Sequence, residues 1–315
     1  MRILLTGGAG FIGSWLAERL VAADHDVIVL DNFSTGILKN LSGIRRTQNL
    51  KILRADVRHV SRPVLKRIGG VDGVCHLAAV TSVQQSIKNP ISVSEVNLMG
   101  TLRILEAARK LHAKRFVFAS SAAVYGAPEA LPVTEDAKLA PMSPYGASKA
   151  SAELYCNSFR ENHGLETISL RYFNIYGPRQ SSSQYSGVIS IFARRVLRKL
   201  PLTIFGDGSQ TRDFVFVEDA VEAAKAALEK DIVHSRIVNV ASGREITILQ
   251  LAKTMQEIAQ VPSDLRFEPS RTGDIHRSLA DTTRAQAELG FLSKTSLRDG
   301  LSRTIEWFAQ EKPSA

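Results

Sequence analysis

The chain has 315 residues, of which 44% are hydrophobic, so it can bury a sizeable core and is not expected to be disordered. Lysine and arginine total 40 against 31 aspartate and glutamate, a net charge of +9, but the basic residues are scattered without interleaved aromatics. This argues against a nucleic-acid-binding surface. No apolar run reaches the length of about 18 residues that a membrane span needs, and no signal peptide follows Met1, so we expect a cytoplasmic protein. The two cysteines, Cys75 and Cys156, suit neither a disulfide framework nor a metal site, and we expect both to be buried.

The first part of the chain, up to residue 172, alternates short apolar runs with longer helical patterns. We expect strands at 2–6, 27–30, 51–55, 73–76, 115–119 and 167–171, and helices that include 11–23, 93–111 and 144–163. This alternation is typical of repeated βαβ units, so the sequence predicts an α/β fold with a doubly wound parallel sheet over 1–172.

The second part, 173–315, is richer in glycine, proline and serine and alternates less regularly, which predicts a smaller C-terminal domain. Within it, a helix at 217–228 and a buried strand at 236–240 resemble the first part again. We therefore expect the chain to return to the first domain around 213–245.

A glycine-rich segment, Thr-Gly-Gly-Ala-Gly-Phe-Ile-Gly at 6–13, directly follows the first expected strand and opens the first helix. Glycines 7, 10 and 13 allow a tight turn, close approach of the backbone to a pyrophosphate, and close helix–strand packing. Asp31 follows about 20 residues later at the end of the second strand, where a carboxylate accepts hydrogen bonds from ribose hydroxyls and repels a 2′-phosphate. The spacing thus favours NAD over NADP.

Two further residues, Asp56 and Val57, end the third expected strand. At this place they can meet the adenine edge, but an aspartate there can equally cap the segment that follows. The sequence leaves both interpretations open.

A tyrosine and a lysine, Tyr145 and Lys149, lie four residues apart at the start of an expected helix, so their side chains share one face about 5–6 Å apart. A phenol is a poor base at neutral pH, and we expect the neighbouring ammonium to lower the pKa of Tyr145. Ser121 follows the strand at 115–119 and could relay a proton to Tyr145, or merely cap a turn.

These residues resemble the extended short-chain dehydrogenases/reductases of the NAD-dependent epimerase/dehydratase family, and among them the UDP-sugar 4-epimerases. The resemblance covers nearly the whole chain. Besides the glycine-rich segment and Tyr145-x-x-x-Lys149, it rests on His76-Leu77-Ala78-Ala79, Asn97, the segment 120–126, Arg171-Tyr172-Phe173-Asn174-x-Tyr176-Gly177-Pro178, Phe205-Gly206-Asp207-Gly208, Thr211-Arg212-Asp213-Phe214 and Arg271-x-Gly273-Asp274.

The resemblance implies a Rossmann domain that binds NAD, a UDP-sugar-binding domain, and Tyr145, Lys149 and Ser121 as catalytic residues. The residues implied at the NAD site are Gly7, Gly10, Phe11, Ile12, Asp31, Asn32, Asp56, Val57, Leu77, Ala78, Asn97, Tyr145, Lys149, Tyr172 and Phe173. Those implied at the UDP-sugar are Ser121, Asn174, Val188, Phe205, Arg212, Arg271, Asp274 and Ser278. Two arginines suit a diphosphate, and Phe205 offers a face to the uracil. The resemblance also implies a homodimer that pairs the helices at 93–111 and 144–163.

The implied reaction is inversion at C4 of a UDP-hexose through a 4-keto intermediate. Related 4,6-dehydratases carry an Asp-Glu pair after the serine or threonine, where this chain has Ala122 and Ala123. Dehydration is therefore not expected. A 4-reductase or decarboxylase of the family remains an alternative, as does a non-catalytic NAD sensor.

The sugar is suggested by Ser278, four residues after Asp274. A bulky aromatic at this place in the family restricts the site to a 2-hydroxyl, whereas a small residue leaves room for N-acetyl. We expect turnover of UDP-N-acetylglucosamine/UDP-N-acetylgalactosamine and of UDP-glucose/UDP-galactose. UDP-glucuronate is the alternative, because Arg179 or Arg277 could meet its carboxylate.

Overall fold

The computed structural model describes residues 1–180, 187–231, 233–261, 264–270 and 275–311. Its centre is a seven-stranded sheet with the order β10-β6-β5-β4-β1-β2-β3, in which all neighbours run parallel. The strands are β1 (Arg2–Thr6), β2 (Asp26–Asp31), β3 (Leu50–Arg54), β4 (Gly73–His76), β5 (Arg115–Ser121), β6 (Glu166–Tyr172) and β10 (Ile237–Val240). The predicted α/β fold with a doubly wound parallel sheet is confirmed.

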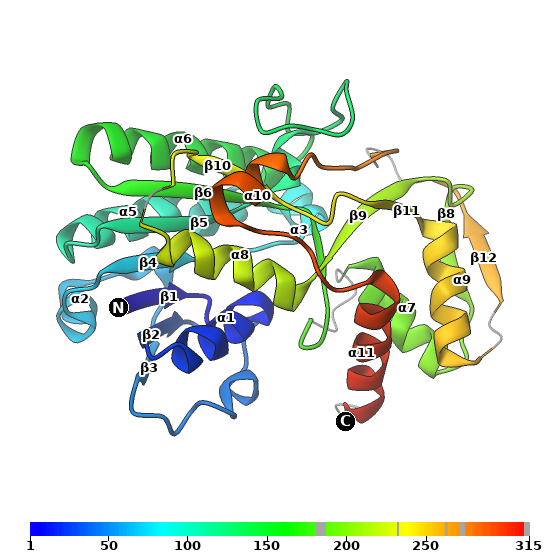
Figure 1. Cartoon of the computed structure of the whole chain (residues 1–315), viewed down its shortest axis with the longest axis horizontal. Helices are drawn as coiled ribbons and strands as arrows, with labels where there is room; N and C mark the ends of the chain where they lie inside the picture. Colours follow the sequence, from blue (N-terminus) through cyan, green and yellow to red (C-terminus); the bar gives the residue numbers. More distant parts are fainter. Residues whose placement is uncertain (181–186, 232, 262–263, 271–274, 312–315) are drawn as a thin grey trace.

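Helices cover both faces of this sheet, which explains why its strands are continuous apolar runs such as Ile3, Leu4 and Leu5, all fully buried. Figure 1 shows α1 (Phe11–Ala22) and α8 (Val217–Glu229) on one face. The other face carries α5 (Gly100–Lys110) and α6 (Pro144–His163), and α2 (Arg62–Ile68) lies near the start of β4.

The sequence order of the strands reverses between β1 and β4. From β1 the chain continues outward to β2 and β3, whereas β4, β5, β6 and β10 follow on the other side. In such open sheets the ligand-binding crevice lies beyond the carboxyl ends of the strands at this reversal. The glycine-rich segment after β1 and the residues after β4 meet there.

The predicted helices occur, with one difference. The helix at 144–163 has the expected bounds, but the expected helix at 93–111 is α4 (Pro90–Ser94), a π-helical turn (Glu95–Met99) and α5 in succession. The helix α3 (Val83–Lys88) precedes them, and short 3₁₀ turns lie at Leu38–Leu41, Val57–His59 and Ala122–Val124. Apolar spacing cannot distinguish these helix types, because each presents one face to the sheet.

The remaining elements form a smaller region at the right of Figure 1. A three-stranded sheet joins β7 (Asn174–Tyr176), β9 (Thr211–Phe216) and the antiparallel β11 (Glu245–Thr247), and a two-stranded sheet joins β8 (Leu202–Phe205) and β12 (Leu265–Glu268). The helices here are α7 (Val188–Leu197), α9 (Ile248–Ala259) and α11 (Leu297–Gln310), while α10 (Thr283–Leu289) returns toward β10.

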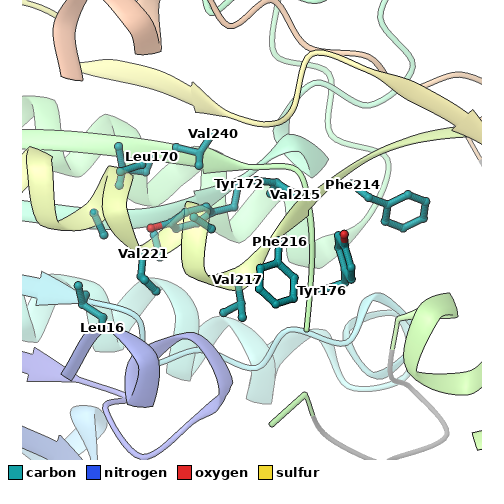
Figure 2. Packing of buried hydrophobic residues seen from close by; sticks show 14 of the residues in the cluster. Leu16, Leu170, Tyr172, Tyr176, Phe214, Val215, Phe216, Val217, Val221 and Val240 are labelled. Carbon is teal, nitrogen blue, oxygen red and sulfur yellow. The ribbon is translucent and has the colours of Figure 1, made fainter. Parts of the chain in front are cut away.

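A continuous apolar core connects the two regions. Figure 2 shows Leu16 of α1, Val221 of α8 and Leu170 of β6, which belong to one buried cluster, and the same cluster includes Val217 and Phe216. Burying each such side chain contributes about 1.5–3 kcal/mol to folding. None of the helices in the described part of the chain is long and apolar enough to cross a membrane.

Candidate active site

The glycine-rich segment makes the tight turn that the sequence predicts. Gly7 has φ +70°, and a Cβ there would lie 2.8 Å from the backbone nitrogen of Ala78, so only glycine fits between β1 and the residues after β4. A Cβ on Gly13 would lie 2.1 Å from the Gly7 carbonyl oxygen. No side chain caps the first amides of α1, which begins at Phe11 and Ile12. These amides suit a pyrophosphate.

Asp31 is buried at the end of β2, and its position is fixed by backbone amides. Its carboxylate accepts from the Ala9 N–H at 3.0 Å and from the Phe33 N–H at 2.8 Å. The carboxylate thus lies beside the glycine-rich segment, where the adenosine ribose of a dinucleotide binds in this type of fold.

Asp56 takes the capping role that the sequence left open. It accepts from the Arg58 N–H at 2.8 Å, which caps the turn at Val57–His59, and it binds the Arg58 guanidinium and the Asn32 amide. These bonds, above all that from the Arg58 side chain, hold the pKa of Asp56 well below its usual range. The Val57 side chain is buried in the core. A role for Asn32, Asp56 and Val57 at the adenine stays a prediction.

His76, at the end of β4, connects the glycine-rich segment to the helices above the sheet. Its Nδ1 lies 2.6 Å from the Thr6 Oγ1, and its Nε2 lies 3.0 Å from the Thr101 Oγ1. Burial, with a smaller effect from the Lys149 charge, lowers the pKa of His76 to about 3, so the ring is neutral. Because the Thr101 hydroxyl donates to the Asn97 carbonyl at 2.5 Å, the His76 Nε2 donates to Thr101.

Asn97 is buried, and its amide is used within the protein. It accepts from the Val80 N–H at 2.8 Å and donates to the Val80 carbonyl at 2.9 Å and to the Ser148 hydroxyl at 3.2 Å. Both amide hydrogens therefore hold the segment after Leu77 and Ala78 against α6. A direct contact of Asn97 with NAD stays a prediction.

The predicted catalytic pair lies in the first turns of α6. The Ser143 hydroxyl caps this helix by accepting from the Gly146 N–H at 3.1 Å, and Pro144 occupies its first position. Tyr145 and Lys149 consequently point toward the end of β5, with exposed fractions of 9% and 3%. Ser121, the last residue of that strand, lines a cavity together with Tyr145 and lowers the pKa of the Tyr145 phenol.

The electrostatics of the pair differ from the sequence-based expectation. Burial raises the pKa of Tyr145, and Ser121 partly offsets this; Lys149 is not among the groups that lower it. The Lys149 ammonium instead donates to the Ala119 carbonyl at 2.7 Å and lies 4.8 Å from the centre of the Phe118 ring. Burial lowers the pKa of Lys149 to about 8. Helical spacing places the Tyr145 and Lys149 side chains on one face of the helix. It does not determine which group the Lys149 ammonium donates a hydrogen bond to.

A cavity of about 220 Å³ opens in front of Ser121 and Tyr145. It brings together Tyr172, Asn174, Arg212 and Ser278, which the resemblance implied at NAD or the sugar. The other lining residues are Val83, Ala122, Ala123, Tyr125, Gly126, Pro128, Leu131, Val133, Phe173, Ile275 and Arg277.

Other predicted residues lie elsewhere. Val188 begins α7 and Phe205 ends β8; neither lines the cavity, and their contacts with UDP stay predictions. Arg271 and Asp274 lie outside the described residues. Phe173, expected near NAD, lines the cavity together with Tyr172.

The Tyr172 hydroxyl is buried without a hydrogen-bond partner in the described part of the chain. Among the described residues it is one of two buried side-chain groups whose polar atom has no such partner. Tyr172 is the last residue of β6, and Figure 2 shows its side chain extending toward Val221 of α8. An unpaired buried hydroxyl costs about 1–3 kcal/mol. With the glycine-rich segment and Asp31 nearby in the fold, the residues present fit a bound dinucleotide.

Backbone contacts orient Arg212 and Asn174, which also line the cavity. The Arg212 guanidinium donates to the carbonyls of Thr211 and Ile275 at 2.7 Å, and the Asn174 amide donates to the Asp213 carbonyl at 3.0 Å. The buried Asp213 carboxylate in turn accepts from Ser242 and its neighbours. Arg212 is thus oriented by β9 and by the segment that carries Ser278.

Sequence reasoning missed a buried ion pair behind the cavity. Arg171 pairs with Glu153 at 2.7 Å, both almost fully buried, and the Arg171 guanidinium lies 4.7 Å from the centre of the Tyr125 ring. The Tyr125 hydroxyl donates to Asn239 at 2.5 Å. Glu153 lies four residues after Lys149 on the same helix face, a spacing that could have indicated it.

Comparison with known proteins agrees with this geometry. The chain is 38% identical over 309 residues to UDP-glucose 4-epimerase of Mycolicibacterium smegmatis, covering 98% of both chains. The structure of UDP-N-acetylglucosamine 4-epimerase from Methanobrevibacter ruminantium, in complex with UDP-N-acetylmuramic acid, has a TM-score of 0.92, 35% identity and coverage of 98% and 97%. UDP-glucuronic acid 4-epimerase of Bacillus cereus, in complex with UDP-glucuronic acid and NAD, has a TM-score of 0.90, 30% identity and coverage of 98% and 99%. Residues 3–241 match the NAD dependent epimerase/dehydratase family, and the chain belongs to it.

Proposed function

We propose that this protein is a UDP-sugar 4-epimerase that uses NAD and inverts C4 of a UDP-hexose through a 4-keto intermediate. The observation that carries the proposal is the meeting of Ser121 and Tyr145 at one cavity, beside Tyr172 at the carboxyl end of the parallel sheet. The full-length similarity to UDP-sugar 4-epimerases supports the same reaction.

The chain's residues supply position and proton transfer. Tyr145 takes the proton of the sugar 4-hydroxyl, and Ser121, which lines the cavity together with Tyr145, holds that hydroxyl and relays the proton. NAD, when bound, would supply the hydride transfer from and to C4 of the sugar. The glycine-rich segment and Asp31 would hold the dinucleotide, and Lys149 is the residue proposed to bind the nicotinamide ribose.

The cavity wall argues against the competing activities. Ala122 and Ala123 line it, so no carboxyl group stands directly after Ser121 to eliminate water from the sugar. A non-catalytic NAD sensor has no need for Ser121, Tyr145 and Lys149 in one constellation next to a sugar-sized cavity. Inversion at C4 therefore fits these residues better than dehydration or sensing.

The proposed substrates are UDP-N-acetylglucosamine and UDP-glucose, each with its C4 epimer. Ser278 lines the cavity, and its small side chain leaves space for a 2-N-acetyl group. Arg212 from the wall, with Arg271 and Asp274, completes the proposed UDP-binding set.

The direct test is an assay for interconversion of each C4 pair by the purified protein without added NAD. We expect epimer formation, with NAD and UDP-sugar detectable by mass spectrometry of the extracted protein. Tyr145→Phe should lose at least about 10²-fold in kcat, since general acid–base catalysis typically contributes about 10²–10⁴-fold. A fully active Tyr145→Phe protein would exclude the mechanism.

A homodimer is part of the proposal. Large apolar side chains lie exposed on α6 and on the elements that pack beside it, including Leu154 at 67%, Ile91 at 78% and Met99 at 42%. Such a patch is typical of a subunit interface. Light scattering should give twice the chain mass, and Leu154→Arg should shift the protein toward monomer.

We also propose which part of the chain binds each ligand, and that the protein is cytoplasmic. Residues 1–172 with 213–245 would bind NAD, and 173–315 would mainly bind the UDP-sugar; the cavity takes lining residues from both parts. Cys75 and Cys156 are free and buried, which agrees with the proposed cytoplasmic location, where disulfides are rare.

A further inference from the structure

An ion pair lies at the wall of the sugar cavity. Arg277 lines the cavity, and its guanidinium binds the Glu245 carboxylate side-on, through Nη2 to Oε1 and through Nε to Oε2 at 3.3 Å. Glu245 itself is not a lining residue. The pair thus places a cation at the wall and its neutralising anion behind it.

The Glu245 side chain is held in place by its own surroundings. Glu245 begins β11 and pairs in register with Asp213 of β9, and its carboxylate also accepts from the Thr211 hydroxyl. It is 22% exposed, against 52% for Arg277. The bond from Arg277, followed by that from Thr211, lowers the pKa of Glu245, so the pair stays ionised at neutral pH.

The pair determines the charge that a sugar meets. Among the described lining residues the charged side chains are Arg212 and Arg277, whereas Ser121, Tyr145 and Ser278 are neutral. Arg212 is oriented by the Thr211 and Ile275 carbonyls, and its proposed ligand is the diphosphate. Among these residues, Arg277 is therefore the cation that is left to bind the sugar. Its Nε and Nη2 donors are already bound to the Glu245 carboxylate.

We propose that Glu245 is a specificity-determining residue, which reserves the cavity for neutral hexoses by holding Arg277 away from a sugar carboxylate. The idea rests on the proposed function, which places C4 at Tyr145. In a hexuronate the carboxylate is attached to C5, next to C4, and needs a charge-assisted partner to replace lost water. With Glu245 in place, that carboxylate competes with an existing anion for the same guanidinium.

The test is Glu245→Gln, which removes the negative charge and keeps a side chain that can bind Thr211. We expect kcat/KM for UDP-glucuronate, relative to UDP-N-acetylglucosamine, to rise about tenfold. The half-exposed Arg277 guanidinium, once released from Glu245, can form an ion pair with the sugar carboxylate. Calorimetry should show a matching fall in the Kd for UDP-glucuronate. Glu257→Gln, which breaks the remote pair with Arg298, is the matched control and should leave the ratio unchanged.

Arg277 provides the second arm of the experiment. Adding Arg277→Gln to Glu245→Gln should abolish the gain, because the cation that the carboxylate meets is gone. An unchanged ratio in Glu245→Gln, or a gain that persists in the double variant, would overturn the proposal. The proposed function is tested independently: it is wrong if the wild-type protein interconverts neither UDP-N-acetylglucosamine nor UDP-glucose with its C4 epimer. In that case the calorimetric Kd for UDP-glucuronate still tests the role of the ion pair.

Discussion

The Lys149 ammonium donates a 2.7 Å hydrogen bond to the carbonyl oxygen of Ala119, two residues before Ser121 on β5. A lysine of α6 thereby ties its helix to the strand that carries the proposed proton relay. Since burial brings the pKa of Lys149 down to about 8, its charge can change at mildly alkaline pH. The same contact leaves Ser121 as the group that lowers the pKa of Tyr145.

Ser121→Ala should therefore move the pH dependence of the reaction as well as its rate. Burial raises the pKa of Tyr145 and Ser121 lowers it, so removal of the hydroxyl raises it further. We expect the limb of the kcat–pH profile that rises with loss of the Tyr145 proton to shift to higher pH, with kcat about 10²-fold lower at neutral pH. Ser296→Ala, which removes the distant cap of α11, should not shift the limb. An unshifted limb in Ser121→Ala would remove Ser121 from the proton path.

Gly7→Ala should abolish retention of NAD, whereas Gly164→Ala should not. Both glycines have positive φ, +70° and +65°, so each alanine costs about 1–2 kcal/mol of backbone strain. Only at Gly7 does the new Cβ meet the Ala78 backbone, at 2.8 Å; at Gly164 nothing lies within 4 Å. Thermal unfolding should show a loss for both variants, and mass spectrometry of extracted nucleotide should separate them. Equal NAD content would contradict the assigned role of the turn.

Local spacing explains what the sequence predicted. The sheet strands, the glycine-rich turn and the helix that carries Tyr145 and Lys149 depend on periodicity and on a few glycines within one segment. Their positions and types follow from neighbours in the chain. The division of the 93–111 segment by a π-helical turn does not follow from apolar spacing, which is similar for both helix types.

The cavity wall depends on contacts between distant segments. Tyr125 and Ser278 both line the cavity because the chain crosses between the two regions. Glu245 and Arg277, 32 positions apart in the sequence, form an ion pair only in the folded chain. No residue pattern encodes such a pairing without the register of β9 and β11. The resemblance to a family supplied Ser278, whereas Glu245 required the structure.

His76 should make the protein sensitive to acid. Its folded-state pKa is about 3 against an ordinary 6.5, so between these values the unfolded chain binds a proton that the folded chain excludes. The contribution of the neutral His76 to the free energy of unfolding is then fully present above pH 6.5. It falls as the pH decreases toward 3, by up to about 1.4 kcal/mol per pH unit. His76→Gln should be less stable at pH 7 but lose stability less steeply in urea unfolding from pH 7 to 4. Replacing the exposed His59 with glutamine should keep the wild-type slope, and an identical slope in His76→Gln would refute the assignment.

Ser278→Tyr should narrow the range of sugars. Ser278 lines a cavity of about 220 Å³, and a phenol ring there would occupy the space proposed for the 2-N-acetyl group. We expect kcat/KM for UDP-N-acetylglucosamine to fall by about 10-fold or more relative to UDP-glucose, as steric exclusion of a substituent costs about 1–3 kcal/mol. Ser278→Ala keeps the space and should leave the ratio unchanged, which separates volume from loss of the hydroxyl. If Ser278→Tyr reduces both sugars equally, the residue limits access to the cavity rather than the choice at C2.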